Sequence, residues 1–165
     1  GYTTDEVLAD LDRREPDSEA FIRPQRRHAD IVVCRMESED DPFILDARLT
    51  LRDTLPHPDL APFVDESDGE ITLEQRNGEQ FLFIPGALPR ERAAAIEEVI
   101  WDRMHFARHL RSEKLGEFTV GNHVHRSESL ALVQLLIVYH LTTARARVAL
   151  GAEPGVPDAA TAFVE

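Results

Sequence analysis

Residues 71–84 read ITLEQRNGEQFLFI, and this stretch decides the fold class. Asn77-Gly78 separates two runs in which apolar and polar side chains alternate, as they do in antiparallel strands. Asn and Gly are the residues that most readily take the positive φ of a two-residue type I′ turn. We therefore predict a hairpin whose register is counted outward from this turn. The predicted pairs are Leu73 with Leu82 and Ile71 with Ile84, with Phe81 and Phe83 on the opposite face.

Two further strands are predicted upstream of the hairpin. Residues 29–34, ADIVVC, form a β-branched run typical of a strand buried on both faces, which favours a parallel sheet. Residues 45–52, LDARLTLR, alternate strictly and predict a half-buried strand. The sequence thus indicates an α+β or α/β fragment, with a mixed β-sheet, an Asn-Gly hairpin and packed helices.

Three helices are expected around these strands. Thr3 and Glu6 have the spacing of a capping box, and Pro16 should end the first helix by Arg14 or Glu15. Apolar side chains recur at helical spacing over residues 89–109, and Ser127 is a good N-cap for a third helix that runs to about residue 150. The segments 54–68 and 111–126 are predicted to be loops, and 151–165 a flexible tail.

Composition narrows the classes of partner. The net charge of −13 argues against nucleic acid and anionic membranes, which would repel such a surface. The longest apolar run, 130–141, falls short of the ~20 residues that span a bilayer. A single cysteine, Cys34, excludes an internal disulfide and suits a reducing cytoplasm, where we expect the protein. The start at Gly1 has no signal-peptide pattern and leads us to expect a piece of a longer protein.

Two stretches carry a resemblance to a known family. The first is GYTTDEVL at 1–8, continued by REPD at 14–17 and FIRPQRRHADIVV at 21–33; the second is RSESLALVQLL at 126–136. Their order resembles the C-terminal part of phosphoribulokinases of the archaeal-type branch and, more loosely, of the uridine-kinase group of P-loop kinases. The resemblance implies a parent reaction in which ATP, with Mg²⁺, phosphorylates D-ribulose 5-phosphate to ribulose 1,5-bisphosphate. It also implies that 1–35 holds a helix that follows the lid and a core strand, and that this chain completes a P-loop kinase fold.

The chain also departs from that family. No Gly-x-x-x-x-Gly-Lys-Ser/Thr motif occurs in the 165 residues, and the family's catalytic carboxylate and lid arginines would lie before Gly1. We therefore expect no catalytic residue, no bound cofactor and no turnover by this chain alone. The expected partners are the absent N-terminal kinase domain, a sugar-phosphate substrate and a second copy in a homodimer. Residues 1–150 are expected to form one C-terminal kinase-like domain, with a β-rich part at 43–86 and two helices at 89–150.

Basic residues near Pro24 are the first candidate site. Four arginines and one aspartate fall within residues 21–35, whereas residues 36–70 hold eleven acids and two arginines. Guanidinium groups bind phosphate oxygens in a bidentate manner, so these arginines are candidate substrate ligands. The alternative is that they pair with nearby acids such as Asp17 and Glu19. The candidate residues are Arg23, Arg26 and Arg27.

Histidines form the second candidate site. His105 and His109 have the i, i+4 spacing of a metal-binding pair on a helix, but no helical Glu joins them, so no metal site is predicted. His125 and Arg126 are instead candidates for the sugar-phosphate pocket.

Three alternatives to the phosphoribulokinase interpretation stay open. They are a free-standing, non-catalytic interaction or regulatory module, a kinase of a related nucleoside or sugar phosphate, and a small metal-dependent hydrolase built on the histidines.

Overall fold

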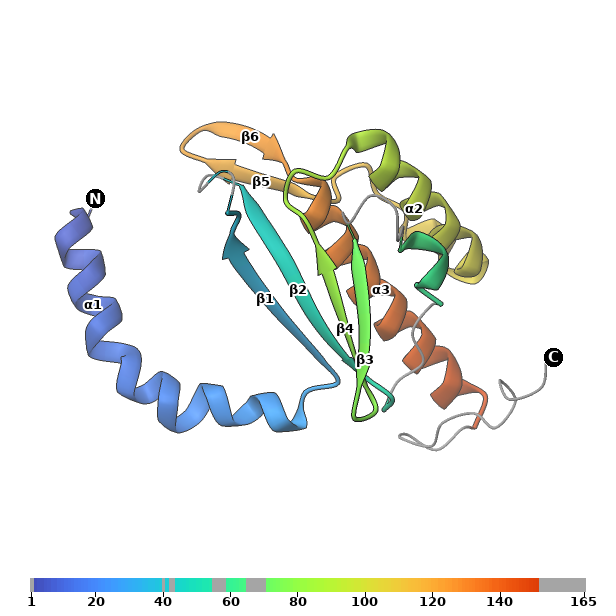
Figure 1. Ribbon diagram of the computed structural model, residues 1–165, viewed down its shortest axis with the longest axis horizontal. Coiled ribbons are helices and arrows are strands. Elements are labelled where there is room, and N and C mark those ends of the chain that lie inside the picture. The colour runs from blue at the N-terminus through green and yellow to red at the C-terminus, as the bar shows by residue number, and fades with distance from the viewer. Residues whose placement is uncertain (1, 40, 42–43, 55–58, 65–70, 152–165) are drawn as a thin grey trace.

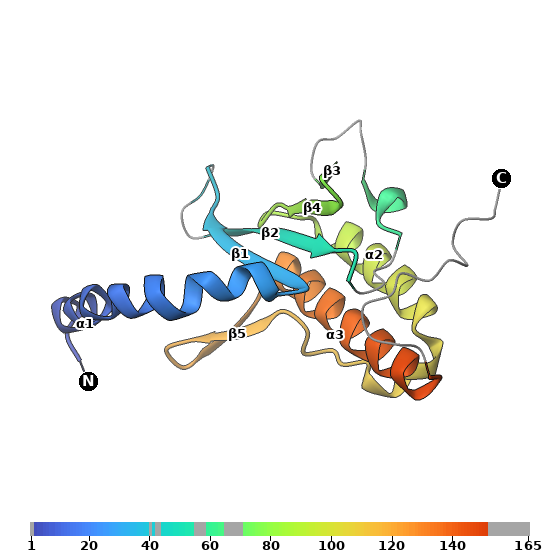
Figure 2. The ribbon, with the colours of Figure 1, turned by 90° about the horizontal axis from the view of Figure 1, so that it is seen from below.

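A four-stranded sheet with two helices packed on one face forms the body of the protein (Figure 1). The computed structural model describes residues 2–39, 41, 44–54, 59–64 and 71–151. Seen from below, the sheet and the helices form two layers, and α1 extends away from both (Figure 2). The fold class is therefore α+β. Most of the predicted loop at 54–68 and almost all of the predicted tail lie outside the described residues.

The sheet has the order β1-β2-β4-β3 and is antiparallel throughout its described strands. The predicted hairpin is confirmed, because Leu73 lies opposite Leu82 and the turn residues Asn77 and Gly78 have φ of 54° and 79°. The strands are β1 (Ile31–Glu37), β2 (Leu45–Arg52), β3 (Thr72–Arg76) and β4 (Glu79–Ile84).

The strand β1 differs from its prediction. It pairs with β2 alone among the described strands and runs antiparallel to it, so it is an edge strand and not a parallel, doubly covered one. Val33 and Cys34 are exposed. A β-branched run predicts an extended backbone, but how many neighbours the strand gains depends on distant segments.

The strand β2 carries the centre of the core. Ala47, Leu49 and Leu51 point to the helices and are fully buried, as the alternation predicted. On its other face Asp46 is also buried, with 8% of the residue exposed, and its carboxylate accepts a hydrogen bond from the Gly86 N–H at 2.7 Å.

The two packed helices are α2 (Arg90–Arg103), which continues into a 3₁₀ turn at His105–Leu110, and α3 (Glu128–Ala149). The predicted N-cap is confirmed, since the Ser127 hydroxyl accepts the Leu130 N–H. By length and composition α3 is apolar enough to cross a membrane, but many of its apolar side chains pack in the core of this structure. Buried side chains from both helices close the core: Ile96, Ile100, Trp101, Leu132, Leu135 and Leu136.

The predicted loop at 111–126 contains a second hairpin. The strands β5 (Glu117–Val120) and β6 (His123–Arg126) pair across Gly121 and Asn122, and Gly121 has φ of 61°. Gly-Asn is itself a two-residue turn signal. The pattern around it is weak because all eight strand residues are exposed, so burial imposes no alternation.

The first helix is longer than predicted. The helix α1 (Thr4–Asp17) includes Pro16 and continues through a π-helical turn at Ser18–Ile22 into a 3₁₀ turn at Arg23–His28. The capping box at Thr3 and Glu6 is present. Proline removes one N–H bond, and the wider turn that follows accommodates this loss without ending the helix. No residue of α1 is buried.

Candidate functional site

The three candidate arginines lie in the 3₁₀ turn that leads into β1, and the turn gives each a different environment. Arg23 forms ion pairs with Glu15 and, at 3.3 Å, with Glu19. Its charge is therefore balanced locally, as the alternative interpretation expected for Glu19. The Arg27 Nε donates to the His28 Nε2 at 3.0 Å. The Arg26 side chain makes no hydrogen bond or ion pair within the part of the chain that the structure describes, and it lines a groove.

A clamp made by Arg52 fixes the end of this turn against the sheet. The Arg52 Nε donates to the Glu79 carboxylate at 2.7 Å, and its Nη1 donates to the Ala29 carbonyl at 2.7 Å. The Arg52 N–H also donates to the Asp30 carbonyl at 3.1 Å. One arginine thus ties β2, β4 and the end of the turn together, close to Arg26.

The sheet face that α2 and α3 leave uncovered, here called the open face, is chemically mixed. Cross-strand pairing places Arg48 beside Phe83, and Thr50 beside Phe81. The second neighbours of these phenylalanines on β3 are Thr72 and Glu74. Both phenylalanines are half-buried and Thr50 is buried, so the middle of the face is apolar with polar groups around it.

A groove of about 840 Å³ runs over this open face. Its volume is within the ~300–1,000 Å³ typical of small-molecule sites. Its walls come from all four strands, from the 3₁₀ turn and from the residues after β1. The lining residues are Arg26, Met36, Glu37, Glu39, Asp46, Arg48, Thr50, Thr72, Glu74, Arg76, Phe81, Leu82 and Phe83.

The cations of the groove are not equivalent. Arg76 forms an ion pair with Glu74. The side chain of Arg48, like that of Arg26, has no hydrogen bond or ion pair within the described segments. The buried carboxylate of Asp46 accepts the Gly86 N–H. Burial lowers the pKa of Arg35, and the negative charge of Asp46 partly opposes this shift. Two arginines are therefore available to an anion from solution.

His125 and Arg126 do not lie with these arginines. The 3₁₀ turn that carries the arginines adjoins Ile31, at the start of β1 (Figure 1). The strand β6 leads into α3 at the other end of β1, where the Ser129 hydroxyl donates to the carbonyl of Leu45, the residue paired with Glu37. The His125 ring stacks on Phe118, with ring centroids 5.6 Å apart. Neither His125 nor Arg126 lines the groove.

Arg126 is the centre of a carboxylate cluster. Its guanidinium donates to Glu128 at 3.0 Å, to Glu97 at 3.1 Å and to the Glu113 carbonyl at 3.2 Å. Burial raises the pKa of the Glu97 carboxyl, and Arg126 partly opposes this. The hydrogen bonds to Glu128 raise the pKa of Arg126. Through this network Arg126 joins α2 to the start of α3.

The histidines do not gather into a metal site. No group of three His, Cys, Asp or Glu side chains is arranged to hold a metal among the described residues. His105 and His109 are exposed and lie in a 3₁₀ turn, where residues three apart share a face, so their i, i+4 spacing loses its helical meaning. His140 is buried in α3 with its ring edge-on to Tyr139.

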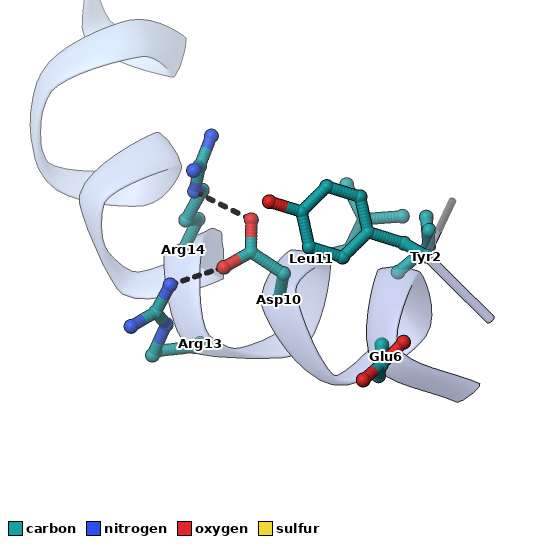
Figure 3. Close-up of a pocket in the computed structure, with 7 residues that line it drawn as sticks. Tyr2, Glu6, Asp10, Leu11, Arg13 and Arg14 are labelled. Atoms are coloured by element: carbon teal, nitrogen blue, oxygen red, sulfur yellow. Dashed lines mark hydrogen bonds and ion pairs between the residues drawn. The ribbon is translucent and has the colours of Figure 1, made fainter. Parts of the chain in front are cut away.

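A second hollow, of about 490 Å³, lies along α1 (Figure 3). Tyr2 and Leu11 line it, and Asp10 forms ion pairs with Arg13 and, at 3.0 Å, with Arg14. Every lining residue belongs to α1 or directly precedes it. The hollow is therefore a feature of an uncovered helix and brings together no reactive side chains from separate elements.

Comparison with known proteins gives no relative: no protein-family model, no curated protein and no solved structure matches this chain.

Proposed function

We propose that this chain is the C-terminal portion of a phosphoribulokinase-like phosphotransferase. In the parent protein, a separate nucleotide-binding part would hold ATP and Mg²⁺. This chain would complete the fold and contribute arginines to the binding of ribulose 5-phosphate. The proposal rests on the order of residues within 1–33 and 126–136 and on one structural observation.

The observation is that α1, which carries the first part of the family-like sequence, has no buried residue. The apolar side chains of α1, namely Val7, Leu8 and Leu11, are each about half exposed or more, and the following Phe21 and Ile22 are over 60% exposed. An isolated helix of this length is only marginally stable in water, so such a surface is expected to be covered in the working protein. A second body that packs on α1 is what a kinase with a separate nucleotide-binding part would provide.

The adjoining edge of β1 supports the same proposal. Among the described strands β1 has a neighbour on one side only, and its sequence, IVVCRME, is longer and more apolar than that of β3 at the other edge. Apolar edge strands tend to pair with a further strand. A parent sheet that continues past β1 would use this edge.

The direct test is an assay of the complete natural gene product beside the 165-residue chain. The complete protein should convert ATP and ribulose 5-phosphate to ADP and ribulose 1,5-bisphosphate, whereas the chain alone should match the no-protein control. Uridine and ribose 5-phosphate serve as competing acceptors, because a related nucleoside or sugar-phosphate kinase would prefer one of them. A complete gene product without a phosphate-binding loop and without turnover would contradict the proposal. The exposed side of α1 would then favour the second candidate, a non-catalytic interaction module.

A further inference from the structure

We propose that the groove on the open face binds a phosphorylated polyol, with Arg26 and Arg48 holding the phosphate. This inference deepens the proposed function, because it assigns the sugar-phosphate site to one part of the chain and adds a residue, Arg48, that the sequence did not single out.

The first step of the argument is charge. The protein carries a net charge of −13, yet two guanidinium groups line one groove without an acidic partner among the described residues. The neighbouring arginines Arg23 and Arg76 do have such partners. Guanidinium groups form strong, charge-assisted hydrogen bonds with phosphate oxygens. The groove therefore holds two guanidinium groups that form no direct ion pair, beside the carboxylates that also line it.

The second step is the way the two arginines are held. Arg48 projects from the middle of β2, which is paired on both sides. Arg26 projects from a turn whose end is tied to the sheet by the Arg52 clamp, at 2.7 Å to Ala29 and 2.7 Å to Glu79. Because both backbones are fixed, a ligand has to order only the two side chains.

The third step is the rest of the lining. Glu37, Glu39 and Glu74 line the same groove, and carboxylates accept hydrogen bonds from hydroxyl groups. The half-buried rings of Phe81 and Phe83 lie under the carbon skeleton of whatever the groove holds. A ligand with one phosphate and several hydroxyl groups satisfies both kinds of charge, whereas a polyanion would meet these carboxylates and be repelled.

The experiment is a titration of the full chain with ribulose 5-phosphate, ribulose and inorganic phosphate, followed by backbone amide NMR shifts. Saturable shifts should centre on residues 46–50 and 81–83 with ribulose 5-phosphate, and both inorganic phosphate and ribulose should bind more weakly. Arg26→Ala and Arg48→Ala should each raise the Kd by about 10- to 100-fold, the loss of one charge-assisted contact. Arg48→Lys should recover part of the loss.

The matched controls are Arg23→Ala and Arg111→Ala, which remove the same charge from arginines that already have acidic partners and do not line the groove. They should change the Kd less than about 2-fold, and the circular dichroism of every variant should match that of the wild type. Equal losses in all four variants would reduce the effect to bulk charge and overturn the proposal. So would the absence of saturable binding, or wild-type affinity in both Arg26→Ala and Arg48→Ala. Ligand binding at this site together with no turnover by the complete protein would overturn the kinase function and leave the site. Turnover that is unchanged in Arg26→Ala and Arg48→Ala would overturn the proposed site and leave the kinase function.

Discussion

Gly116→Ala should be among the most damaging single-atom additions in this protein. Gly116 lies between α2 and the β5–β6 hairpin with φ of 79°, a left-handed conformation that costs other residues about 1–2 kcal/mol. A Cβ there would be 2.4 Å from the Ser127 carbonyl oxygen and 2.9 Å from the Ala131 Cβ. Both obstacles belong to the start of α3, where the Gly116 carbonyl accepts the Ser127 N–H at 2.9 Å and the Gly116 N–H donates to Gln134 at 2.7 Å. Overpacking of this kind costs about 1–3 kcal/mol, so the total loss should be about 2–5 kcal/mol.

Gly121→Ala is the matched control for this prediction. Gly121 also has positive φ, 61°, but an added Cβ would have no neighbour within 4 Å, so only the backbone cost of about 1–2 kcal/mol should appear. Urea unfolding can be followed by the fluorescence of Trp101, the single tryptophan, which is buried beside α3. The difference between the two variants isolates the steric term. Equal losses in both would refute the reasoning, because they would mean that α3 moves aside freely from Gly116.

Three other variants test separate parts of the fold. Burial holds the pKa of Glu97 above its ordinary 4.5, so the contribution of this group to stability is fully present below pH 4.5 and is lost as pH rises through the folded pKa. Glu97→Gln should abolish this part of the pH dependence of the urea midpoint. An unchanged pH profile would contradict the assignment. Thr3→Ala should lower the helical circular dichroism signal, since an N-cap contributes about 1 kcal/mol. It should leave the unfolding midpoint measured by Trp101 fluorescence unchanged, because no residue of α1 is buried. A shifted midpoint would show that α1 packs on the core. Arg52→Ala should lower the free energy of urea unfolding by roughly 1–3 kcal/mol through the lost hydrogen bonds to Glu79 and Ala29. Arg52→Lys should restore only part of this stability. Full restoration by lysine would show that the clamp is a simple charge pair.

Features set by local chemistry could be predicted from the sequence. Asn77-Gly78 specifies its own turn, and the register of Leu73 with Leu82 follows by counting from it. The Ser127 cap is equally local, because the hydroxyl needs only the backbone three residues ahead. The environment of β1 could not be predicted, since whether a strand is an edge or a centre depends on segments far away in the sequence.

The candidate site likewise combines a feature that the sequence shows locally with features that depend on distant segments. Arg26 could be singled out as part of a basic stretch, but its combination with Arg48 arises from sheet pairing and from the Arg52 clamp. No spacing in the sequence records that combination. The sequence singles out Arg126 as a basic residue beside a histidine. Its partners, Glu97 on α2 and Glu128 on α3, could not be predicted, because they come together at Arg126 only in the folded chain.

The position of α3 within the chain has a consequence for biosynthesis. The strands β2 and β4 leave the ribosome well before residues 128–149, so Leu49, Leu51 and Leu82 lack the part of their cover that α3 provides until α3 has been synthesised. During that interval the nascent sheet exposes apolar surface and is an aggregation-prone intermediate of the kind that chaperones bind. A translation product that stops before Glu128 would keep the sheet strands and α2 but lose α3 and the core side chains that it contributes, and aggregation, more than partial function, would be its outcome.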